Sequence, residues 1–388
     1  MPLTREHLDM IHTVPKKQLR LTLGAWRRLA RKIDSSRSQL GWHRRIVYWL
    51  SSASHSCLSR IQHARYDDAL KTAVPGPPIF LLGFWRSGTT FLHELFCCDT
   101  RFGFSSTYAC LNPTHFLLTE EWSHRYEQKQ AARRPMDDMR YSWASPQEDE
   151  FALLALGASS PYEALIAPSL MCDPRLLLDL RQRSREEQEH WKESLLYFLR
   201  LLTVQQGKPM ILKSPPHGFK LPLLPALFPG ARYVVIERNP YEVFASNLKM
   251  WQTLLDLYSL ECYSLAEIEA FVLSAYAVHE ETIAEGARQI SPGSLVRIRY
   301  EDLVADPIRQ MARLYMGLGI GEFETVRQRL EEHVAGVANH RRNRFSLSAN
   351  QKARVDKLWG DLIREKGYSW CDDYVAVREP VYSSNRIA

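Results

Sequence analysis

The most informative stretch of this sequence is Phe80-Leu81-Leu82-Gly83-Phe84-Trp85-Arg86-Ser87-Gly88-Thr89-Thr90-Phe91-Leu92. An apolar run breaks there into a hydroxyl-rich turn and then resumes with helical periodicity. The two glycines stand five positions apart, which is the spacing of the phosphate-binding motif G-x-x-x-x-G. In such a loop the backbone N–H groups and the positive end of the following helix converge on an anion. The stretch therefore predicts a strand, a phosphate-binding loop and a helix.

The loop differs from a nucleoside-triphosphate loop in its cation. A lysine normally follows the second glycine, but here Thr89 and Thr90 follow Gly88 and the nearest cation, Arg86, lies inside the loop. The loop is thus suited to phosphate-like groups without being a standard ATP site. A P-loop kinase or a similar nucleotide-dependent transferase is the alternative enzyme class.

The composition is that of a globular protein. The chain has 388 residues, of which 45% are hydrophobic and 24% charged, so it can bury a full core. Its seven cysteines include no C-x-x-C pair, and neither a disulfide framework nor a zinc site is expected. No apolar run approaches the roughly 20 residues of a membrane span, and the first nine residues contain no secretory apolar core. We therefore expect a cytoplasmic protein.

Positive charge is concentrated at the N-terminus. Residues 1–66 hold thirteen Lys and Arg residues and three acidic residues, whereas the whole chain has a net charge of +6. Apolar residues alternate with these cations between positions 19 and 33. The pattern predicts an amphipathic helix that rests on an anionic membrane face, covers a substrate cleft or packs on the core. Nucleic-acid binding is not expected, because the sequence contains no recognisable module for it.

The remaining chain alternates between strand and helix patterns. Strands are predicted at 79–83, 210–213, 232–238 and 294–300, and helices at 89–98, 181–206, 240–251 and 263–289. The cluster Pro75-Gly76-Pro77-Pro78 predicts a boundary between a basic helical extension over 1–74 and an α/β domain over 75–388. Such alternation gives a P-loop-like, three-layer fold with a central parallel sheet, and ligands bind at the carboxyl ends of its strands.

Two further strand ends carry polar motifs. Arg238 ends the strand 232–238, and Ser246 stands eight residues later on the helix that begins at Pro240. An arginine in this place offers a bidentate fork to a phosphate, and the helix would bring the serine hydroxyl to the same group. The segment Leu212-Lys213-Ser214-Pro215-Pro216-His217 stands at the end of another strand.

Together these motifs resemble those of sulfotransferases that use 3′-phosphoadenosine 5′-phosphosulfate (PAPS). Residues 85–90 are similar to the family's 5′-phosphosulfate loop, and 238–246 to its binding motif for the 3′-phosphate. Residues 212–217 look like the Leu-Lys-Ser-Pro-x-His segment of a largely bacterial group. Tyr300-Glu301-Asp302-Leu303 is similar to the family's segment after the last strand, and 340–344, with Arg341 and Arg342, to its late cationic loop over the 3′-phosphate.

The resemblance implies metal-free transfer of the sulfuryl group of PAPS to a hydroxyl of a small molecule, lipid or carbohydrate. The residues implied to hold the 5′-phosphosulfate are Trp85, Arg86, Ser87, Gly88, Thr89 and Thr90. Lys213 or Arg86 would neutralise charge on the departing oxygen. The alternative is that the protein is not an enzyme. It would then be an anion-binding protein that its basic N-terminal arm recruits to membranes.

The resemblance does not decide which residue acts as the general base. His217 is the first candidate, because it follows a strand end and an imidazole titrates near neutral pH. Cytosolic family members place the histidine two residues after the lysine, however, where this chain has Pro215. Glu148 and Glu150, from an acidic run before a predicted helix, are the rival candidates.

Overall fold

The computed structural model describes residues 18–127, 132–133, 140–337 and 347–370. Its centre is a five-stranded parallel sheet in the order β2-β5-β1-β6-β7. The strands are β1 (Ile79–Leu82), β2 (Gly103–Phe104), β5 (Met210–Lys213), β6 (Arg232–Glu237) and β7 (Leu295–Arg299). A separate antiparallel pair consists of β3 (Ala132–Arg133) and β4 (Arg140–Tyr141). The predicted α/β class and parallel sheet are confirmed.

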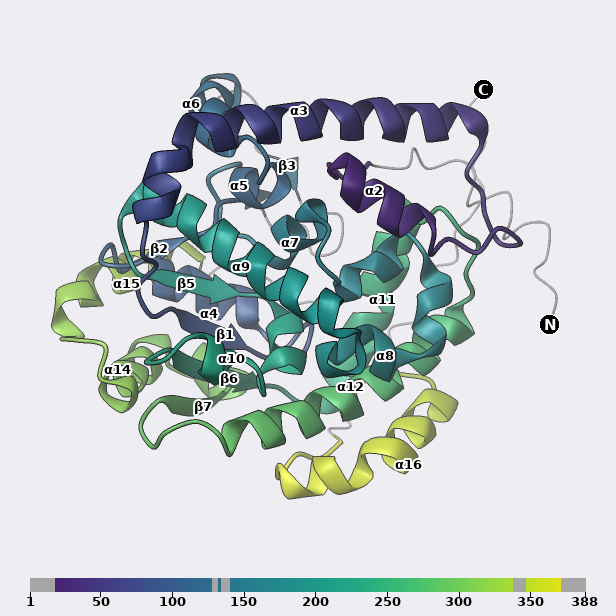
Figure 1. Cartoon of the computed structure of the whole chain (residues 1–388). Coiled ribbons are helices and arrows are strands. Elements are labelled where there is room, and N and C mark those ends of the chain that lie inside the picture. Colours follow the sequence, from purple (N-terminus) through teal and green to yellow (C-terminus); the bar gives the residue numbers. More distant parts are fainter. Residues whose placement is uncertain (1–17, 128–131, 134–139, 338–346, 371–388) are drawn as a thin grey trace, which may run out of the picture.

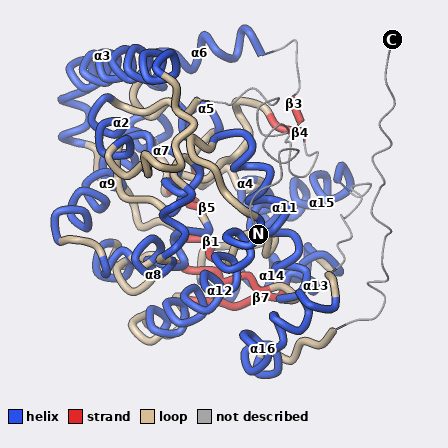
Figure 2. The backbone as a smooth tube through the Cα atoms, turned by 90° about the vertical axis from the view of Figure 1, so that its right-hand side faces the viewer, coloured by secondary structure: helices blue, strands red, loops and turns tan. Residues whose placement is uncertain are grey.

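Helices cover both faces of this sheet, as Figures 1 and 2 show. Alternate residues of β1 point to opposite faces, which is the period of a strand. Phe80 and Leu82 pack with residues of α9 (Arg185–Gln206) and with Ile283 of α12 (Leu265–Ala287). Ile79 and Leu81 pack with α4 (Thr89–Cys97), α14 (Pro307–Leu318) and α15 (Glu324–Val337). These two buried clusters give the three layers.

The other described helices surround these layers. The α-helices are α2 (Leu23–Ala30), α3 (Trp42–Thr72), α5 (Thr107–Leu111), α6 (Phe116–Glu127), α7 (Glu150–Leu156), α8 (Pro174–Leu178), α10 (Leu224–Leu227), α11 (Pro240–Tyr258), α13 (Tyr300–Ala305) and α16 (Ala349–Glu365). The 3₁₀ turns are Pro161–Leu165, Pro168–Cys172, Leu180–Gln182 and Pro215–Lys220. No helix in this part of the chain combines the length and apolarity needed to cross a bilayer.

The N-terminal arm shares the core of the α/β unit. Leu19, Leu21, Trp26 and Leu29 are buried in the same cluster as Phe84 and Trp85 of the loop after β1. The amide of Thr22 donates to the carbonyl of Ala155 at 3.0 Å. Of the three predicted placements for the segment 19–33, the structure has the one packed on the core. Most of its apolar side chains are buried against the rest of the protein.

Candidate active site

Three neighbouring strands bring the sequence motifs to one edge of the sheet. β5 and β6 both pair with β1 in parallel, with Leu81 opposite Lys213 and Leu82 opposite Val235. The carboxyl ends of the three strands therefore lie side by side. The loop 83–88 leaves β1, Lys213 ends β5, and Arg238 directly follows β6.

The loop after β1 has the backbone of an anion cradle. Arg86 and Gly88 both have positive φ angles, of 68° and 100°. Gly88 is the residue from which α4 begins. A side chain at Gly83 would place its Cβ 2.5 Å from Ser87 Oγ, so only glycine fits there. Ser87 Oγ is buried and has no hydrogen-bond partner within the described protein.

Tyr300 joins this loop to the cluster after β6. A Cβ at Gly88 would overlap the Tyr300 ring, so the glycine is required by close packing as well as by its φ angle. The same ring lies 4.4 Å from the guanidinium carbon of Arg238, in a cation–π contact. Glu301, the next residue, accepts a hydrogen bond from the amide of Asn239 at 2.9 Å. The segment 300–301 therefore fixes both the loop and the start of α11.

The two predicted phosphate clusters touch directly. Arg86 Nε donates to Ser246 Oγ at 2.9 Å, and Arg238 Nη1 donates to the carbonyl of Arg86 at 3.2 Å. Asn247, beside Ser246 on α11, donates from Nδ2 to the carbonyl of Trp85 at 2.8 Å. Arg238 is also paired with Glu242, one helical turn along. The loop and the Arg238–Ser246 cluster are thus in direct contact.

A chain of hydrogen bonds leads from the loop to Lys213. Trp85 Nε1 donates to Tyr162 Oη at 3.1 Å, and Tyr162 donates to Glu148. Burial, followed by the neighbouring Glu148 carboxylate, raises the pKa of Tyr162 well above its usual range, so the phenol stays protonated. Glu148 in turn accepts a hydrogen bond from Lys213 Nζ at 3.0 Å. The indole of Trp85 itself packs in the core, 5.3 Å from the ring of Trp251.

The three consecutive acids 148–150 have different environments. The Glu148 side chain is 16% exposed beside Lys213. Asp149 is fully buried and lies 2.6 Å from Nε2 of His217, which is also fully buried. Glu150 is fully buried as well, and both its oxygens are held by Lys220 Nζ, at 2.7 and 2.8 Å. Of the candidate bases, only Glu148 is partly open to solvent.

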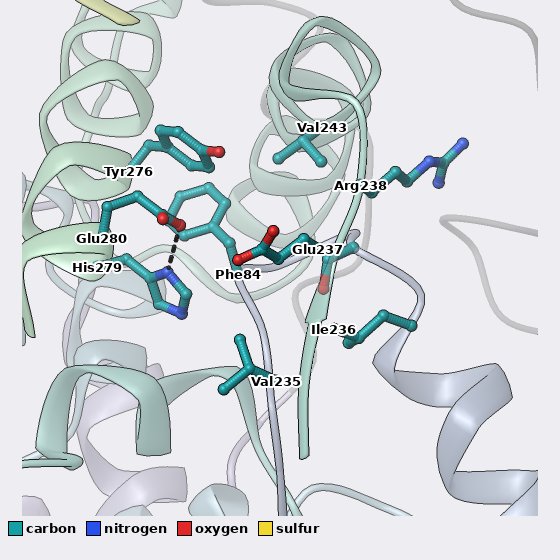
Figure 3. Close-up of a pocket in the computed structure, with 10 residues that line it drawn as sticks. Phe84, Val235, Ile236, Glu237, Arg238, Val243, Tyr276, His279 and Glu280 are labelled. Atoms are coloured by element: carbon teal, nitrogen blue, oxygen red, sulfur yellow. Dashed lines mark hydrogen bonds and ion pairs between the residues drawn. The ribbon is translucent and has the colours of Figure 1, made fainter. Parts of the chain in front are cut away.

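A small cavity lies behind the loop, between β6 and α12. Its volume is about 10 Å³, far too small for a nucleotide. In Figure 3 the His279 and Glu280 side chains face Phe84, while the Arg238 guanidinium points away from them. Ser87 and His279 line this cavity. The cavity belongs to the packing that supports the loop, and the charged end of Arg238 is directed to the opposite side.

Several residues of this site have no clear signal in the sequence. Tyr162 comes from a 3₁₀ turn far along the chain, and Glu242 and Asn247 are ordinary helix residues of α11. Tyr300 and Glu301, like Glu242, stand in segments that the sequence already singles out. Thr89 and Thr90 form the first turn of α4, as predicted. The predicted cations Arg341 and Arg342 lie outside the described residues.

Known proteins match both the sequence and the fold. Residues 77–324 match the model of the Sulfotransferase family. Over 345 residues, which cover 89% of each chain, this chain is 35% identical to the omega-hydroxy-beta-dihydromenaquinone-9 sulfotransferase Stf3 of Mycobacterium bovis and of Mycobacterium tuberculosis.

Two solved structures share its fold at low sequence identity. Sulfotransferase STF9 from Mycobacterium avium has a TM-score of 0.64 at 17% identity, covering 92% of this chain and 99% of its own. Sulfotransferase STF1 from Mycobacterium tuberculosis has a TM-score of 0.60 at 19% identity, covering 87% and 93%. The family match and the 35% identity along most of the sequence show that the chain belongs to the sulfotransferase family.

Proposed function

We propose that the protein transfers the sulfuryl group of PAPS to a hydroxyl of a lipid acceptor. The observation that carries the proposal is the contact between the two anion clusters, with Arg86 Nε 2.9 Å from Ser246 Oγ. PAPS has a phosphosulfate at its 5′ end and a phosphate at its 3′ end. A site in which two such clusters adjoin at one sheet edge suits a nucleotide with two anionic ends.

The described residues fit both ends of this nucleotide. At the 5′ end, Gly83 and Gly88 keep the cradle free of side chains. Thr89 and Thr90 present the N-terminus of α4, whose dipole favours an anion. At the 3′ end, Arg238 is held over the Tyr300 ring and Ser246 lies beside Arg86.

We assign the general base to Glu148. Its carboxylate is partly exposed, and it lies 3.0 Å from Lys213 Nζ, so base and cation are neighbours. In transfer, the acceptor oxygen bonds to sulfur as the bond from sulfur to the bridging oxygen breaks. The hydroxyl proton passes to Glu148, and the charge on the departing bisphosphate is neutralised by Lys213 and Arg86. The buried positions of His217 and Glu150 favour structural roles for these two residues.

The acceptor class is proposed from the relatives. The name of the 35% identical proteins gives a hydroxylated dihydromenaquinone as their acceptor. We extend this to a hydroxyl on an isoprenoid lipid for the present chain. Cytoplasmic placement, predicted from the sequence, remains part of this proposal.

Thermal-shift measurements with three nucleotides test the donor. PAPS and adenosine 3′,5′-bisphosphate should each raise the melting temperature, because a ligand that binds only the native state stabilises it. ATP with Mg²⁺ should have a much smaller effect. A larger shift with ATP and Mg²⁺ would instead support the kinase alternative.

Turnover tests the transfer itself. With PAPS and a polyprenyl alcohol in detergent, the enzyme should release adenosine 3′,5′-bisphosphate and form a sulfate ester. Binding of PAPS without release in the presence of a panel of lipid, carbohydrate and aryl alcohols would support the non-catalytic alternative. Release with carbohydrate or aryl alcohols alone would keep the sulfotransferase but reject the lipid acceptor.

A further inference from the structure

The helix α3 presents an apolar stripe to solvent. Six of its large hydrophobic residues are at least 48% exposed: Trp42 at 65%, Ile46 at 48%, Val47 at 53%, Trp49 at 50%, Leu50 at 56% and Ile61 at 50%. Four of them, Trp42, Ile46, Trp49 and Leu50, stand at the spacing i, i+4, i+7 and i+8, which places them on one face of a helix. We call these four residues the outer stripe. Exposed apolar residues gathered in this way mark an interaction surface.

The opposite side of α3 is already occupied by the protein. Tyr48, Ser52, Gln62 and Leu70 are buried. Tyr48 stacks on Trp26 with ring centroids 4.4 Å apart, and Gln62 Nε2 donates to the carbonyl of Pro113 at 3.0 Å. Figure 1 shows α3 as a long helix along one margin of the molecule, and Figure 2 shows it end-on at the same margin. The outer stripe is therefore a second apolar face on a helix that is fixed in place.

Between Trp42 and Arg65 the charges of α3 have one sign, and its two acidic residues, Asp67 and Asp68, follow that stretch. Residues 42–65 contain Arg44, Arg45, Arg60 and Arg65 and no acidic residue. All four arginines are exposed. Apolar side chains that include two tryptophans, flanked by arginines, are the pattern of a helix that lies in a membrane interface with anionic lipids.

We propose that α3 docks the protein on an anionic lipid bilayer, with the outer stripe in the interface and the arginines at the headgroups. The charge pattern favours this partner over a second copy of the chain. A two-fold contact through the stripe would bring the arginines of two α3 helices together, and like charges repel. The membrane contact is thus assigned to α3, because the apolar residues of 19–33 are largely buried. This docking goes beyond the transfer reaction and needs neither PAPS nor turnover.

Vesicle sedimentation tests the docking with the full chain. Vesicles of phosphatidylcholine with phosphatidylglycerol should bind the wild type, and vesicles of phosphatidylcholine alone should bind it much less. The double substitution Trp49→Ser/Leu50→Ser should weaken binding by about tenfold or more, since each side chain contributes apolar burial in the interface. Arg44→Ser/Arg45→Ser should lose most of the preference for phosphatidylglycerol.

Leu358→Ser is the matched control, because Leu358 is also a helix residue that is 56% exposed, on α16. It should bind vesicles like the wild type. No binding by the wild type, or equal loss in the control and in Trp49→Ser/Leu50→Ser, would overturn the proposal. So would a wild-type dimer in light scattering that Trp49→Ser/Leu50→Ser converts to a monomer.

Discussion

Glu148 and Glu150 stand two positions apart and have opposite surroundings. Glu148 precedes α7 and meets Lys213 and Tyr162, whereas Glu150 begins the helix and is enclosed with Lys220. A half-turn of backbone thus separates a partly exposed carboxylate from a fully buried one. Substitutions of the two residues are therefore expected to have different effects.

Glu148→Gln should abolish most of the turnover while leaving nucleotide binding intact. A general base accelerates a reaction about 100-fold to 10,000-fold, so kcat should fall by roughly that factor. The dissociation constant for adenosine 3′,5′-bisphosphate, measured by calorimetry, should change little. His217→Gln is the comparison variant. If it loses kcat as Glu148→Gln should, with its stability retained, the base is His217 and the assignment is wrong.

Glu150→Gln should instead destabilise the fold. Removing one partner of a buried ion pair costs about 3–5 kcal/mol, because the remaining charge is left uncompensated. Burial lowers the pKa of Lys220, and Glu150 opposes that shift. Urea unfolding measures the loss, with Glu189→Gln on the surface of α9 as the control. A stable Glu150→Gln protein without activity would place Glu150 in catalysis.

Tyr162→Phe tests the connection between the loop and the base. The substitution removes the hydroxyl that accepts from Trp85 and donates to Glu148. We expect kcat to fall by about tenfold, the cost of one hydrogen bond to a charged group, with smaller changes in nucleotide affinity. An unchanged kcat would show that the Tyr162 hydroxyl plays no part in turnover.

At the scale of elements, an ion cluster joins the C-terminal end of α16 to the sheet. Lys366 Nζ lies 2.6 Å from Glu280 on α12 and 2.9 Å from Glu237 at the end of β6. Burial would raise the pKa of Glu280, but His279 and Lys366 lower it to about 2. Glu237 directly precedes Arg238, the residue proposed to bind the 3′-phosphate. This ion cluster therefore anchors the strand end next to Arg238.

The Glu280 cluster predicts a pH-dependent stability. The folded pKa of Glu280 lies below its ordinary value of 4.5, so its stabilisation is present above that value and is lost as the pH falls toward 2. The difference in unfolding free energy between the wild type and Glu280→Gln should therefore shrink by about half from pH 6 to pH 3. A difference that stays constant over this range would contradict the assigned pKa.

The sequence predicts some strands and helices more accurately than others, and the differences have physical causes. β5 is found at its predicted residues and α4 within one residue of them, because short apolar runs and a glycine loop leave local signals. α11 extends to Tyr258, beyond the predicted end at Trp251, since that tryptophan is buried and packing continues past it. The outer stripe of α3 was missed. Both faces of that helix are partly apolar, and a pattern cannot say which of them the protein covers.

The candidate site was predictable at its strand ends but not between them. The loop, Lys213, Arg238 and Ser246 carry motifs, and the parallel register brings them to one edge. Tyr162 and the pairings of the acids 148–150 depend on contacts between distant segments. Local sequence holds no information about such contacts, and for this reason the sequence alone leaves His217, Glu148 and Glu150 all as candidates for the base.

At the scale of the whole molecule, the N-terminal arm and the α/β unit form one packed body. The arm buries residues of α2 against the loop cluster, while α3 keeps its outer stripe exposed. The loop after β1, Tyr162 and the first turns of α11 all contribute side chains to this shared core. We propose that a single nucleotide is bound at both of its anionic ends by residues that follow or end three adjacent strands, β5, β1 and β6.

Calorimetric titration with adenosine 3′,5′-bisphosphate and adenosine 5′-monophosphate tests that claim most directly. The wild type should bind the bisphosphate about 10 to 100 times more tightly, as expected for one or two charge-assisted hydrogen bonds to the 3′-phosphate. Arg238→Met should lose most of this preference while still binding the monophosphate. Equal affinity for the two nucleotides in the wild type, or an undiminished preference in Arg238→Met, would contradict the two-ended site.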